Sequence, residues 1–319
     1  MMAIEMTAPG GADVLMPTQV NRPVPRPGEI LIKVAAAGVN RPDILQRRGL
    51  YPPPPGASDI LGLEVAGTVE GENHYFPKGC RVMALLPGGG YAEYAVAKAD
   101  HVIEIPDHLS FEAAAGLPET VYTVWANVME AGALQKGETL FVHGATSGIG
   151  TMAASIGNAF GATVYGTAGS PEKCAAAERL GFAKCYNYRE DDWADQMVKQ
   201  GGADVVLDMV GGDYVAKNLS FLNHRGRHIS IAFLQGATAT LPIFPVMQKQ
   251  LVLTGSTLRG RTDDEKARLT AEIEEHILPH IRSKNILPII DRVFPMQEAA
   301  QAHGHMEQGD HVGKIILSV

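Results

Sequence analysis

Apolar residues after position 137 gather in short continuous runs separated by helix-like segments. The runs lie at positions 139–143, 163–167, 185–188, 204–210, 227–231 and 251–254. The segment after Gly150 places Met152, Ile156 and Phe160 on one face, which is helical spacing. Continuous apolar strands that alternate with helices are typical of a parallel sheet covered on both faces. This part of the chain is therefore predicted to form a doubly wound α/β domain.

The first third of the chain has shorter apolar runs that end at glycine or proline. They cover positions 30–34, 63–69, 81–86, 91–96 and 102–106. Short β-type segments bounded by turn residues are typical of a compact, mostly antiparallel β domain. The boundary is predicted near Leu117-Pro118. We expect domains over residues 1–117 and 118–255, followed by a C-terminal segment over 256–319.

The C-terminal segment contains a predicted helix start. Thr262 and Glu265 have the spacing of a capping box, and an apolar stripe at positions 269, 273, 277 and 281 follows them. Pro279 is expected to kink or shorten this helix. The chain closes on a strand-like run at positions 313–317.

A glycine-rich turn follows the first predicted strand of the parallel sheet. The sequence HGATSGIG at positions 143–150 leads from a strand into a helix, as a dinucleotide site requires. Its glycine spacing is GxxxGxG, which differs from the common GxGxxG. A glycine-rich turn without a ligand is the alternative, and the strand–turn–helix context disfavours it.

The second strand of the same domain indicates which nucleotide is preferred. Sites for NAD usually place an acidic residue at the tip of this strand, on the ribose 2′-hydroxyl. Here the run at 163–167 leads to Ala168 and Gly169 without a carboxylate, and Glu172 comes only within the next helix. Ser170 can donate a hydrogen bond to a phosphate and Lys173 can neutralise it. The pattern favours NADP over NAD, although Lys173 alone would fit a solvated surface lysine.

Composition narrows the class of protein. The 319 residues carry 27 basic and 35 acidic side chains, a net charge of −8, without a basic block. This balance argues against nucleic-acid or membrane binding. No membrane-spanning run or signal peptide is evident, and Cys80, Cys174 and Cys185 form no CxxC pair. A cytoplasmic location with the cysteines as small buried residues is expected.

Several longer motifs occur along the chain: AGVNRPD (37–43), LGLEVAG (61–67), the glycine turn, AGS (168–170) with Lys173, Asn187-Tyr188 and the tail from 302 to 315. Together they resemble one family, the medium-chain dehydrogenase/reductase superfamily in its zeta-crystallin-like NADPH:quinone oxidoreductase branch. The resemblance covers essentially the whole chain. YPPPPGAS (51–58) and ILPH (277–280) are similar to the tumour-suppressor-induced quinone oxidoreductases within that branch.

The resemblance implies a fold, a cofactor and an assembly. The fold would be a Rossmann doubly wound parallel sheet plus a GroES-like β domain, the latter built from the first third and the C-terminal segment. NADPH would be the cofactor, and edge strands of the Rossmann domain would form a homodimer. The residues implied to bind NADPH are Asn40, Thr123, Gly144, Ser147, Gly148, Ile149, Gly150, Gly169, Ser170, Lys173, Tyr188, Phe233, Leu234, Ser256 and Thr257.

The resemblance also bears on the nicotinamide half and the 2′-phosphate end of the implied site. Asn40 and Asp43 would lie beside the nicotinamide half, where we expect them to take part in catalysis together with Tyr51. A C-terminal arginine that helps to bind the 2′-phosphate in some relatives is replaced near Gln308. This replacement reduces the expected selectivity for NADPH.

Zinc is not expected. Zinc alcohol dehydrogenases of this superfamily use a cysteine in the segment equivalent to 38–43 and a histidine at the position of Leu63. Leucine cannot coordinate a metal, and three cysteines cannot supply the four-cysteine structural site. Without a Lewis acid, alcohol oxidation is disfavoured. Quinones and conjugated enones delocalise the charge that hydride transfer delivers, so a hydrogen-bond donor can suffice.

Tyr51 is the candidate donor or platform for the acceptor, and packing on the neighbouring prolines is an equally good interpretation. The spacing of two histidine pairs, His276 with His280 and His303 with His305, also suits metal ligands. Neither pair has a convincing third ligand in the sequence.

Three functions remain open at this stage. The first is an NADPH-dependent quinone reductase acting on a small-molecule quinone or enone. The second is an enone or enoyl-thioester reductase of the same fold, which would differ in its acceptor pocket. The third is a crystallin-like protein that binds NADPH and has little activity.

Overall fold

The computed structural model describes all residues from 1 to 319, and the chain divides into two compact units. The first unit consists of Met1–Tyr122, Arg259–Arg282 and Leu287–Val319. The second consists of Thr123–Leu258 and Ser283–Ile286. Most of the C-terminal segment therefore packs with the N-terminal third.

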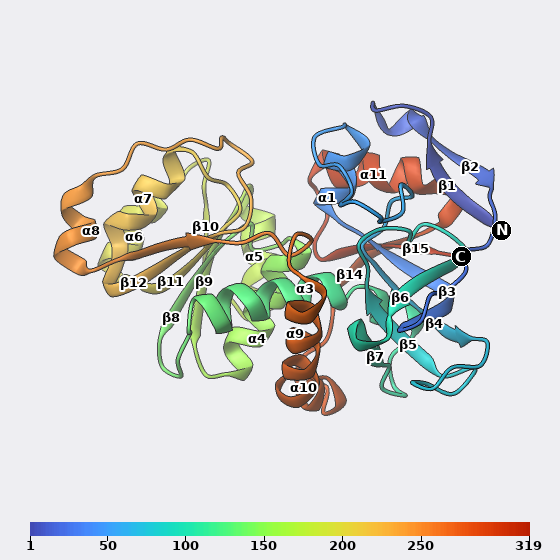
Figure 1. Ribbon diagram of the computed structural model, residues 1–319. Helices are drawn as coiled ribbons and strands as arrows, with labels where there is room; N and C mark the ends of the chain where they lie inside the picture. Colours follow the sequence, from blue (N-terminus) through green and yellow to red (C-terminus); the bar gives the residue numbers. More distant parts are fainter. The chain divides into compact units, whose positions relative to one another are not determined.

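A six-stranded parallel sheet forms the centre of the second unit (Figure 1). Its strands are β8 (Thr139–His143), β9 (Thr163–Ala168), β10 (Lys184–Asn187), β11 (Ala203–Asp208), β12 (Leu222–Ser230) and β13 (Val252–Gly255). They lie in the order β10-β9-β8-β11-β12-β13. Counted along the chain this is 3-2-1-4-5-6, the strand order of the Rossmann fold. The predicted doubly wound sheet is confirmed.

Helices cover both faces of this sheet. They are α4 (Gly148–Ala159), α5 (Pro171–Arg179), α6 (Trp193–Lys199), α7 (Asp213–Phe221) and α8 (Ile243–Lys249). Figure 1 shows α6 and α7 on one side of the sheet and α4 on the other. The fully buried Phe141 of β8 stacks on Trp193 and meets the ring of Phe221 edge-on, with ring centres 5.8 and 5.0 Å away. Strand β8, which leads into the glycine turn, is thereby fixed at the centre of the sheet.

A buried polar network lies beneath the strand ends of the second unit. His143 bonds through Nδ1 to Thr167 Oγ1 at 2.9 Å and through Nε2 to Asn218 Oδ1 at 2.8 Å. Asp208 Oδ2 is 3.2 Å from His228 Nε2, and Asp208 Oδ1 accepts from the backbone N–H of Val210 at 2.7 Å. Burial lowers the pKa of His143. His143 therefore ends β8 with both ring nitrogens bonded inside the protein.

The first unit is built on a seven-stranded sheet. Its strands are β3 (Glu29–Val39), β4 (Glu64–Glu70), β5 (Arg81–Leu85), β6 (Tyr94–Lys98), β7 (Val102–Glu104), β14 (Ile290–Pro295) and β15 (Lys314–Ser318). Their order is β14-β15-β3-β4-β5-β7, and β6 pairs with β3. Every pairing is antiparallel except that of β14 with β15. The tail strand β15 joins the sheet beside β3, so the two ends of the chain share one core.

Helices of the first unit are α1 (Arg41–Arg47), α2 (Phe111–Ala115), α3 (Pro118–Val124, its last two residues in the second unit), α9 (Asp263–His276), α10 (Leu278–Arg282) and α11 (Ala299–Gln308). The capping box at Thr262 is confirmed: the Glu265 N–H donates to Thr262 Oγ1, and the Thr262 N–H donates to Glu265 Oε2. As predicted for Pro279, α9 ends at His276 and a separate short helix follows. None of the helices has both the length and the apolar character needed to cross a bilayer.

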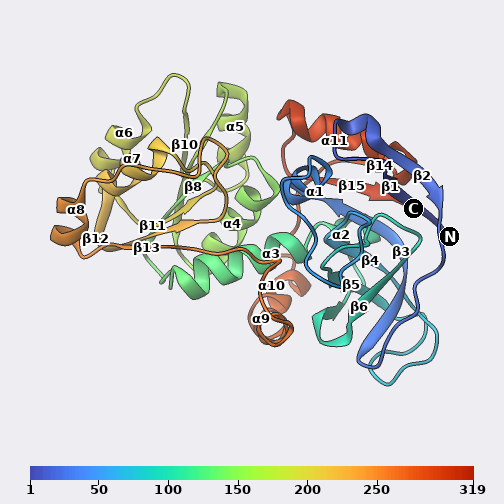
Figure 2. The same cartoon turned by 45° about the horizontal axis from the view of Figure 1, so that its top comes forward.

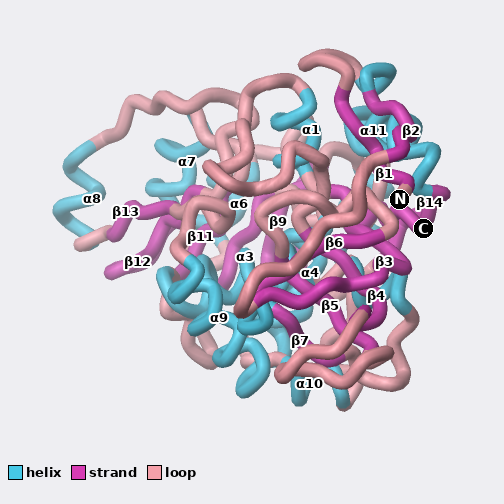
Figure 3. Tube along the Cα trace, turned by 45° about the vertical axis from the view of Figure 1, so that its right-hand side comes forward, coloured by secondary structure: helices cyan, strands magenta, loops and turns pink.

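Some elements were not predicted from the sequence. Strands β1 (Met2–Met6) and β2 (Leu15–Gln19) form an N-terminal hairpin, and α11 lies beside it (Figure 2). Residues Trp125–Ala131 form a π-helix. Helix α8 was not predicted either, and its apolar residues Ile243, Phe244 and Met247 are 62–71% exposed. Figure 3 places α8 close to β13, the edge strand of its sheet.

All three cysteines are free thiols. Cys174 and Cys185 are buried as expected, whereas Cys80 is only partly buried. The side chains of Cys174 in α5 and Cys185 in β10 hydrogen-bond to one another, although they are well separated in the sequence. Burial raises the pKa of both thiols.

Candidate active site

The turn at the end of β8 requires glycine at its two ends, Gly144 and Gly150. Gly144 has a φ of 70°, in the left-handed region that favours glycine. A Cβ atom on Gly150 would lie 2.3 Å from the Gly144 carbonyl oxygen. Ser147 is the N-cap of α4, and its hydroxyl accepts from the Gly150 N–H at 3.0 Å. The turn is thus a tight backbone cradle that leads into the N-terminus of a twelve-residue helix, the arrangement that binds phosphate groups.

The next strand ends without an acidic residue at its tip. Ser170 is the N-cap of α5 and accepts from the Lys173 N–H at 3.3 Å, so Lys173 lies in the first turn. Tyr188 follows β10 and is 38% exposed. A Cβ atom on Gly169 would lie 2.6 Å from the Tyr188 hydroxyl, so this glycine lets the tyrosine approach. Hydrogen bonds from its own backbone N–H and from the Ser170 hydroxyl lower the pKa of the exposed Glu172.

The remaining predicted cofactor residues of the second unit lie at three places. Phe233 and Leu234 follow β12, Ser256 and Thr257 follow β13, and Thr123 lies near the end of α3. Phe233 and Leu234 are 64% and 56% exposed, and the Leu234 N–H donates to the Met209 carbonyl after β11. Ser256 donates through its hydroxyl to Asn127 Oδ1 at 2.8 Å, while Asn127 Nδ2 donates to the Thr123 carbonyl at 2.8 Å. Thr257 is exposed. Asn127, which the sequence did not single out, therefore links two predicted residues.

These loops share one edge of the parallel sheet. The turns that contain Gly144, Gly169, Tyr188, Phe233 and Ser256 all follow the carboxyl ends of strands that run in the same direction. In open α/β sheets this edge is where ligands bind. The second unit can therefore present glycine turns, helix N-termini and a lysine to a dinucleotide.

In the first unit, Asp43 is 1% exposed and fixed on three sides. Its Oδ2 accepts from the Asn40 backbone N–H at 2.8 Å and from the Tyr91 hydroxyl at 3.2 Å, and its Oδ1 accepts from the Gly62 N–H at 3.1 Å. Burial raises the pKa of Asp43 to about 6, and these hydrogen bonds oppose the shift. Asp43 thus joins the start of α1 to the loop before β4.

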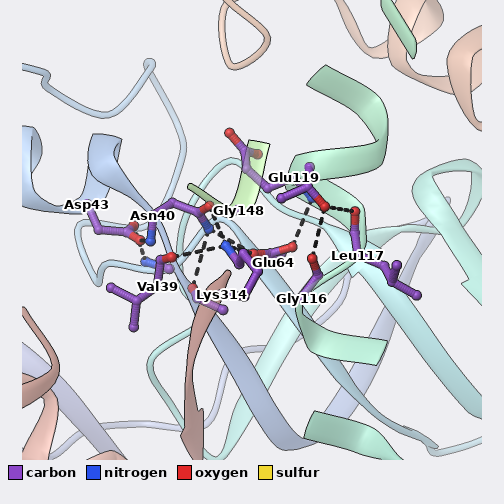
Figure 4. Close-up of polar contacts among 12 residues, drawn as sticks. Val39, Asn40, Asp43, Glu64, Gly116, Leu117, Glu119, Gly148 and Lys314 are labelled. Atoms are coloured by element: carbon purple, nitrogen blue, oxygen red, sulfur yellow. Dashed lines mark hydrogen bonds and ion pairs between the residues drawn. The ribbon is translucent and has the colours of Figure 1, made fainter. Parts of the chain in front are cut away.

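Asn40 belongs to a buried ionic cluster (Figure 4). Lys314 Nζ lies 2.7 Å from Glu64 Oε1, 2.6 Å from Asn40 Oδ1 and 3.0 Å from the Val39 carbonyl oxygen. Asn40 Nδ2 donates to Glu64 Oε1 at 2.9 Å. Glu64 and Lys314 are at most 5% exposed. This cluster orients the Asn40 amide through both of its polar atoms.

Glu119 extends the cluster toward α3. Its backbone N–H donates to Glu64 Oε2 at 2.9 Å, which completes the hydrogen bonding of that carboxylate. Burial, and secondly the charge of Glu64, raise the pKa of the Glu119 side chain to about 8. The Glu119 carboxyl group therefore keeps its proton at neutral pH.

A hydrogen-bond chain leads from Asp43 to the surface of the same unit. The Tyr91 hydroxyl lies 3.1 Å from His303 Nε2, and His303 Nδ1 lies 3.3 Å from Arg47 Nη1. Burial, and secondly Arg47, lower the pKa of His303 to about 3, so its ring is neutral. Arginine can only donate, so Nδ1 accepts and Nε2 carries the proton. Arg47 also pairs with Glu307 at 2.8 Å.

Tyr51 is partly buried, and a cation lies near its ring. The guanidinium of Arg259 lies 5.5 Å from the centre of its ring. Burial raises the pKa of the Tyr51 hydroxyl, and Arg259 opposes the shift. Asn40 and Asp43 are hydrogen-bonded to each other, whereas the contact established for Tyr51 is with Arg259.

Both histidines of the pair at 303 and 305 are engaged in other contacts. His303 is used by Tyr91 and Arg47, and His305 Nε2 bonds to Asp291 Oδ2 at 2.7 Å. No three histidine, cysteine, aspartate or glutamate side chains anywhere in residues 1–319 come together as a metal-binding group. Leu63, at the position of the zinc-binding histidine in zinc enzymes, is 2% exposed.

Comparison with known proteins adds to this geometry. A family model described as "Alcohol dehydrogenase GroES-like domain" matches residues 26–107, and one described as "Zinc-binding dehydrogenase" matches residues 148–275. Quinone oxidoreductase of Homo sapiens is 32% identical over 329 residues, which cover 99% of this chain and 97% of that protein. Both units therefore have relatives in one family.

Solved structures give the same result. The Escherichia coli quinone oxidoreductase, solved with NADPH, is 28% identical with a TM-score of 0.89, and the match covers 100% of both chains. The JamJ enoyl reductase has a TM-score of 0.88 at 21% identity, covering 99% of this chain and 98% of that chain, and so shares the fold. On this evidence the chain is an oxidoreductase that belongs to the medium-chain dehydrogenase/reductase superfamily, with a GroES-like and a Rossmann domain and with quinone oxidoreductases among its relatives.

Proposed function

We propose that the protein is an NADPH-dependent oxidoreductase of the zeta-crystallin-like branch that reduces quinones or related conjugated carbonyl compounds. One observation carries this proposal: the glycine turn after β8 and the acid-free tip of β9 lie at one edge of the sheet, with Ser170, Lys173 and Tyr188 beside that tip. The full-length similarity to quinone oxidoreductases supports the acceptor class. Oxidation of NADPH that depends on an added quinone tests the proposal directly.

The residues at this edge fit NADPH. The turn at 144–150 would hold the pyrophosphate on the N-terminus of α4, where a helix has free backbone N–H groups. Gly150 permits the tight turn, since a Cβ atom there would lie 2.3 Å from the Gly144 carbonyl oxygen. Gly169, Ser170, Lys173 and Tyr188 would hold the 2′-phosphate. Phe233-Leu234, Ser256-Thr257 and Thr123 of the second unit would hold the nicotinamide half. Bound NADPH would supply the hydride.

Lys173→Ala should weaken NADPH binding and leave NADH binding nearly unchanged. Lysine forms a charge-assisted contact with the 2′-phosphate, and its loss should cost about 1.5–3 kcal/mol, or roughly tenfold to a hundredfold in Kd. Fluorescence titration of wild type and variant with both nucleotides measures this. Lys199→Ala is the matched control, since Lys199 is exposed at the end of α6. Equal wild-type affinity for the two nucleotides would refute the NADPH assignment.

Asn40, Asp43 and Tyr51 act on the acceptor side in this proposal. Asp43 is held by three donors and holds the start of α1, so the Asn40 amide has a fixed direction. The Tyr51 phenol can donate to an oxygen that gains charge or lie flat against a conjugated ring. None of these roles requires a metal ion.

Tyr51→Phe separates the two possible roles of the phenol. If the hydroxyl donates, kcat/KM for a quinone should fall about tenfold while the Kd for NADPH stays constant, because one neutral hydrogen bond is worth about 0.5–1.5 kcal/mol. If the ring only stacks, Tyr51→Phe should have almost no effect and Tyr51→Ala should raise KM. Steady-state kinetics decide between them. Unchanged kinetics in both variants would make Tyr51 a packing residue.

We also propose a homodimer through the edge of the Rossmann sheet. Strand β13 is the edge strand, and Val252 is 48% exposed on it. Ile243, Phe244 and Met247 add a large exposed apolar face on α8. An unpaired edge strand is a template for pairing with another chain, and a large exposed apolar patch marks an interaction site. Light scattering should give twice the chain mass of 34.0 kDa, and Phe244→Asp should shift it toward the monomer. A monomeric wild type would contradict the dimer.

A further inference from the structure

Arg259 is a buried arginine that the sequence did not single out. Only 8% of its surface is exposed. Its Nε and Nη2 both donate to the Pro87 carbonyl oxygen, at 2.9 and 2.6 Å, and its own carbonyl oxygen accepts from Lys266 Nζ at 3.0 Å. Backbone and guanidinium are both anchored, so the direction of the remaining Nη1 atom is fixed.

The Nη1 atom of Arg259 is buried and has no hydrogen-bond partner in the protein. Burying such a donor without an acceptor is unfavourable, and for a charged group the cost is larger. Folded proteins satisfy nearly all such groups, so an orphaned one indicates a missing acceptor. The first unit therefore contains a cationic donor that is placed for an oxygen atom from outside the chain.

The surroundings of Arg259 indicate what kind of molecule carries that oxygen. The ring of Tyr51 faces the guanidinium at 5.5 Å. Near the Pro87 anchor, Gly88 has no side chain, and a Cβ atom there would lie 2.8 Å from the Ser58 carbonyl oxygen and 3.5 Å from Arg259 Nη2. Burial lowers the pKa of the Arg259 guanidinium, and the nearby carboxylate of Asp43 opposes this shift. A planar aromatic surface and a cationic donor together suit a flat conjugated carbonyl compound.

We propose that Arg259 Nη1 binds the carbonyl oxygen of the acceptor, with the Tyr51 ring as the surface on which the flat acceptor lies. This inference rests on the proposed function and deepens it. When the acceptor takes a hydride from NADPH, an electron pair of its conjugated system shifts to this carbonyl oxygen. The acceptor thereby becomes an enolate or a hydroquinone anion, with the negative charge on that oxygen. Arg259 stabilises that negative charge, and the oxygen then takes a proton from water. A donor aimed at developing charge lowers the barrier more than it strengthens substrate binding.

Arg259→Met tests this role with kinetics. The variant should lose roughly tenfold to a hundredfold in kcat/KM for a quinone, as expected for a charge-assisted hydrogen bond, while its Kd for NADPH stays constant. Arg259→Lys should recover part of the loss, because it keeps the charge but not the bidentate hold on Pro87. Arg268→Met, an arginine 44% exposed on α9, should behave as wild type. An equal loss of NADPH affinity would assign Arg259 to the cofactor and overturn the inference.

A binding probe tests the site without turnover. In the presence of NADP⁺, 4-nitrophenol should bind to the wild type, and binding should shift its ionisation toward the phenolate. The shift is measured as an increase in phenolate absorbance. It should vanish in Arg259→Met. If that variant does not fold, the same titration on Arg259→Lys decides, with a weaker shift expected. A shift that persists in full, or kinetics unaffected by Arg259→Met, would overturn the inference and leave the proposed function intact. A wild type that reduces no quinone or enone would instead refute the proposed function.

Discussion

Lys314→Met should lower the free energy of unfolding by about 3–5 kcal/mol, because it leaves a buried carboxylate without its cation. Glu64 is fully buried and would keep only the Asn40 amide and the Glu119 N–H as donors. Methionine matches the lysine stem, so the loss comes from charge and hydrogen bonding. Urea unfolding at pH 7 measures the change, and thermal unfolding should shift down by about 10 °C.

Two variants control this experiment. Lys184→Met removes an equally close ion pair, Lys184 with Glu178 at 2.8 Å, in which the lysine is 53% exposed. It should cost less than about 1 kcal/mol, since water screens exposed pairs. Glu64→Gln combined with Lys314→Met should recover much of the loss, because no buried charge remains unpaired. Equal costs for Lys314→Met and Lys184→Met would contradict the ionic role of the cluster.

Glu119→Gln should remove a pH-dependent loss of stability. The pKa of Glu119 is about 8 in the folded protein, against 4.5 for an ordinary glutamate. Between these values the folded state holds a proton that the unfolded state has released, so stability falls as pH rises from about 4.5 to 8. By its exposed surface Glu119 is only half-buried, so screening by water limits the effect to on the order of 2 kcal/mol. Chemical unfolding of wild type and variant at pH 5 and pH 8 measures it.

The expected result is a difference in stability between wild type and Glu119→Gln that grows in favour of the variant from pH 5 to pH 8. Asp43, whose pKa is raised to about 6, titrates in both proteins, so its contribution cancels in the comparison. Glu190→Gln, at an exposed glutamate of the second unit, should give a constant difference. A constant difference for Glu119→Gln as well would show that Glu119 is ionised at neutral pH.

The parallel sheet could be predicted because its signal is local. Each strand is an uninterrupted apolar run, and HGATSGIG marks the turn at which β8 enters α4. The capping box at Thr262 and the effect of Pro279 are local in the same way. Patterns of this kind depend only on neighbours along the chain, so sequence periodicity is enough to find them.

The buried ionic cluster could not be predicted because its members meet only through the fold. Lys314 comes from the last strand and reaches Val39, Asn40 and Glu64 across the pairing of β15 with β3. A weak signal was present: Glu64 and Lys314 each interrupt an apolar run, and buried charges usually occur in pairs. The sequence gives no rule for which charge pairs with which.

Arg259 and His303 were missed or misinterpreted for a similar reason. His303 was weighed as a metal ligand because of its spacing from His305, whereas the fold places it between Tyr91 and Arg47. Arg259 lies in a segment without strong periodicity, and its contact with Pro87 joins positions 172 residues apart. Tyr51 was recognised from a motif, but the cation beside it required the structure.

The central claim is that this chain transfers hydride from NADPH to conjugated carbonyl acceptors. The most direct measurement is the oxidation of NADPH, followed at 340 nm, against a panel of quinones, enones and enoyl thioesters, with a no-acceptor control. We expect acceptor-dependent oxidation that is fastest with quinones and slower with NADH in place of NADPH. Activity confined to enoyl thioesters would replace the quinone assignment with the second function that the sequence left open. NADPH binding without oxidation by any acceptor would contradict the proposed hydride transfer.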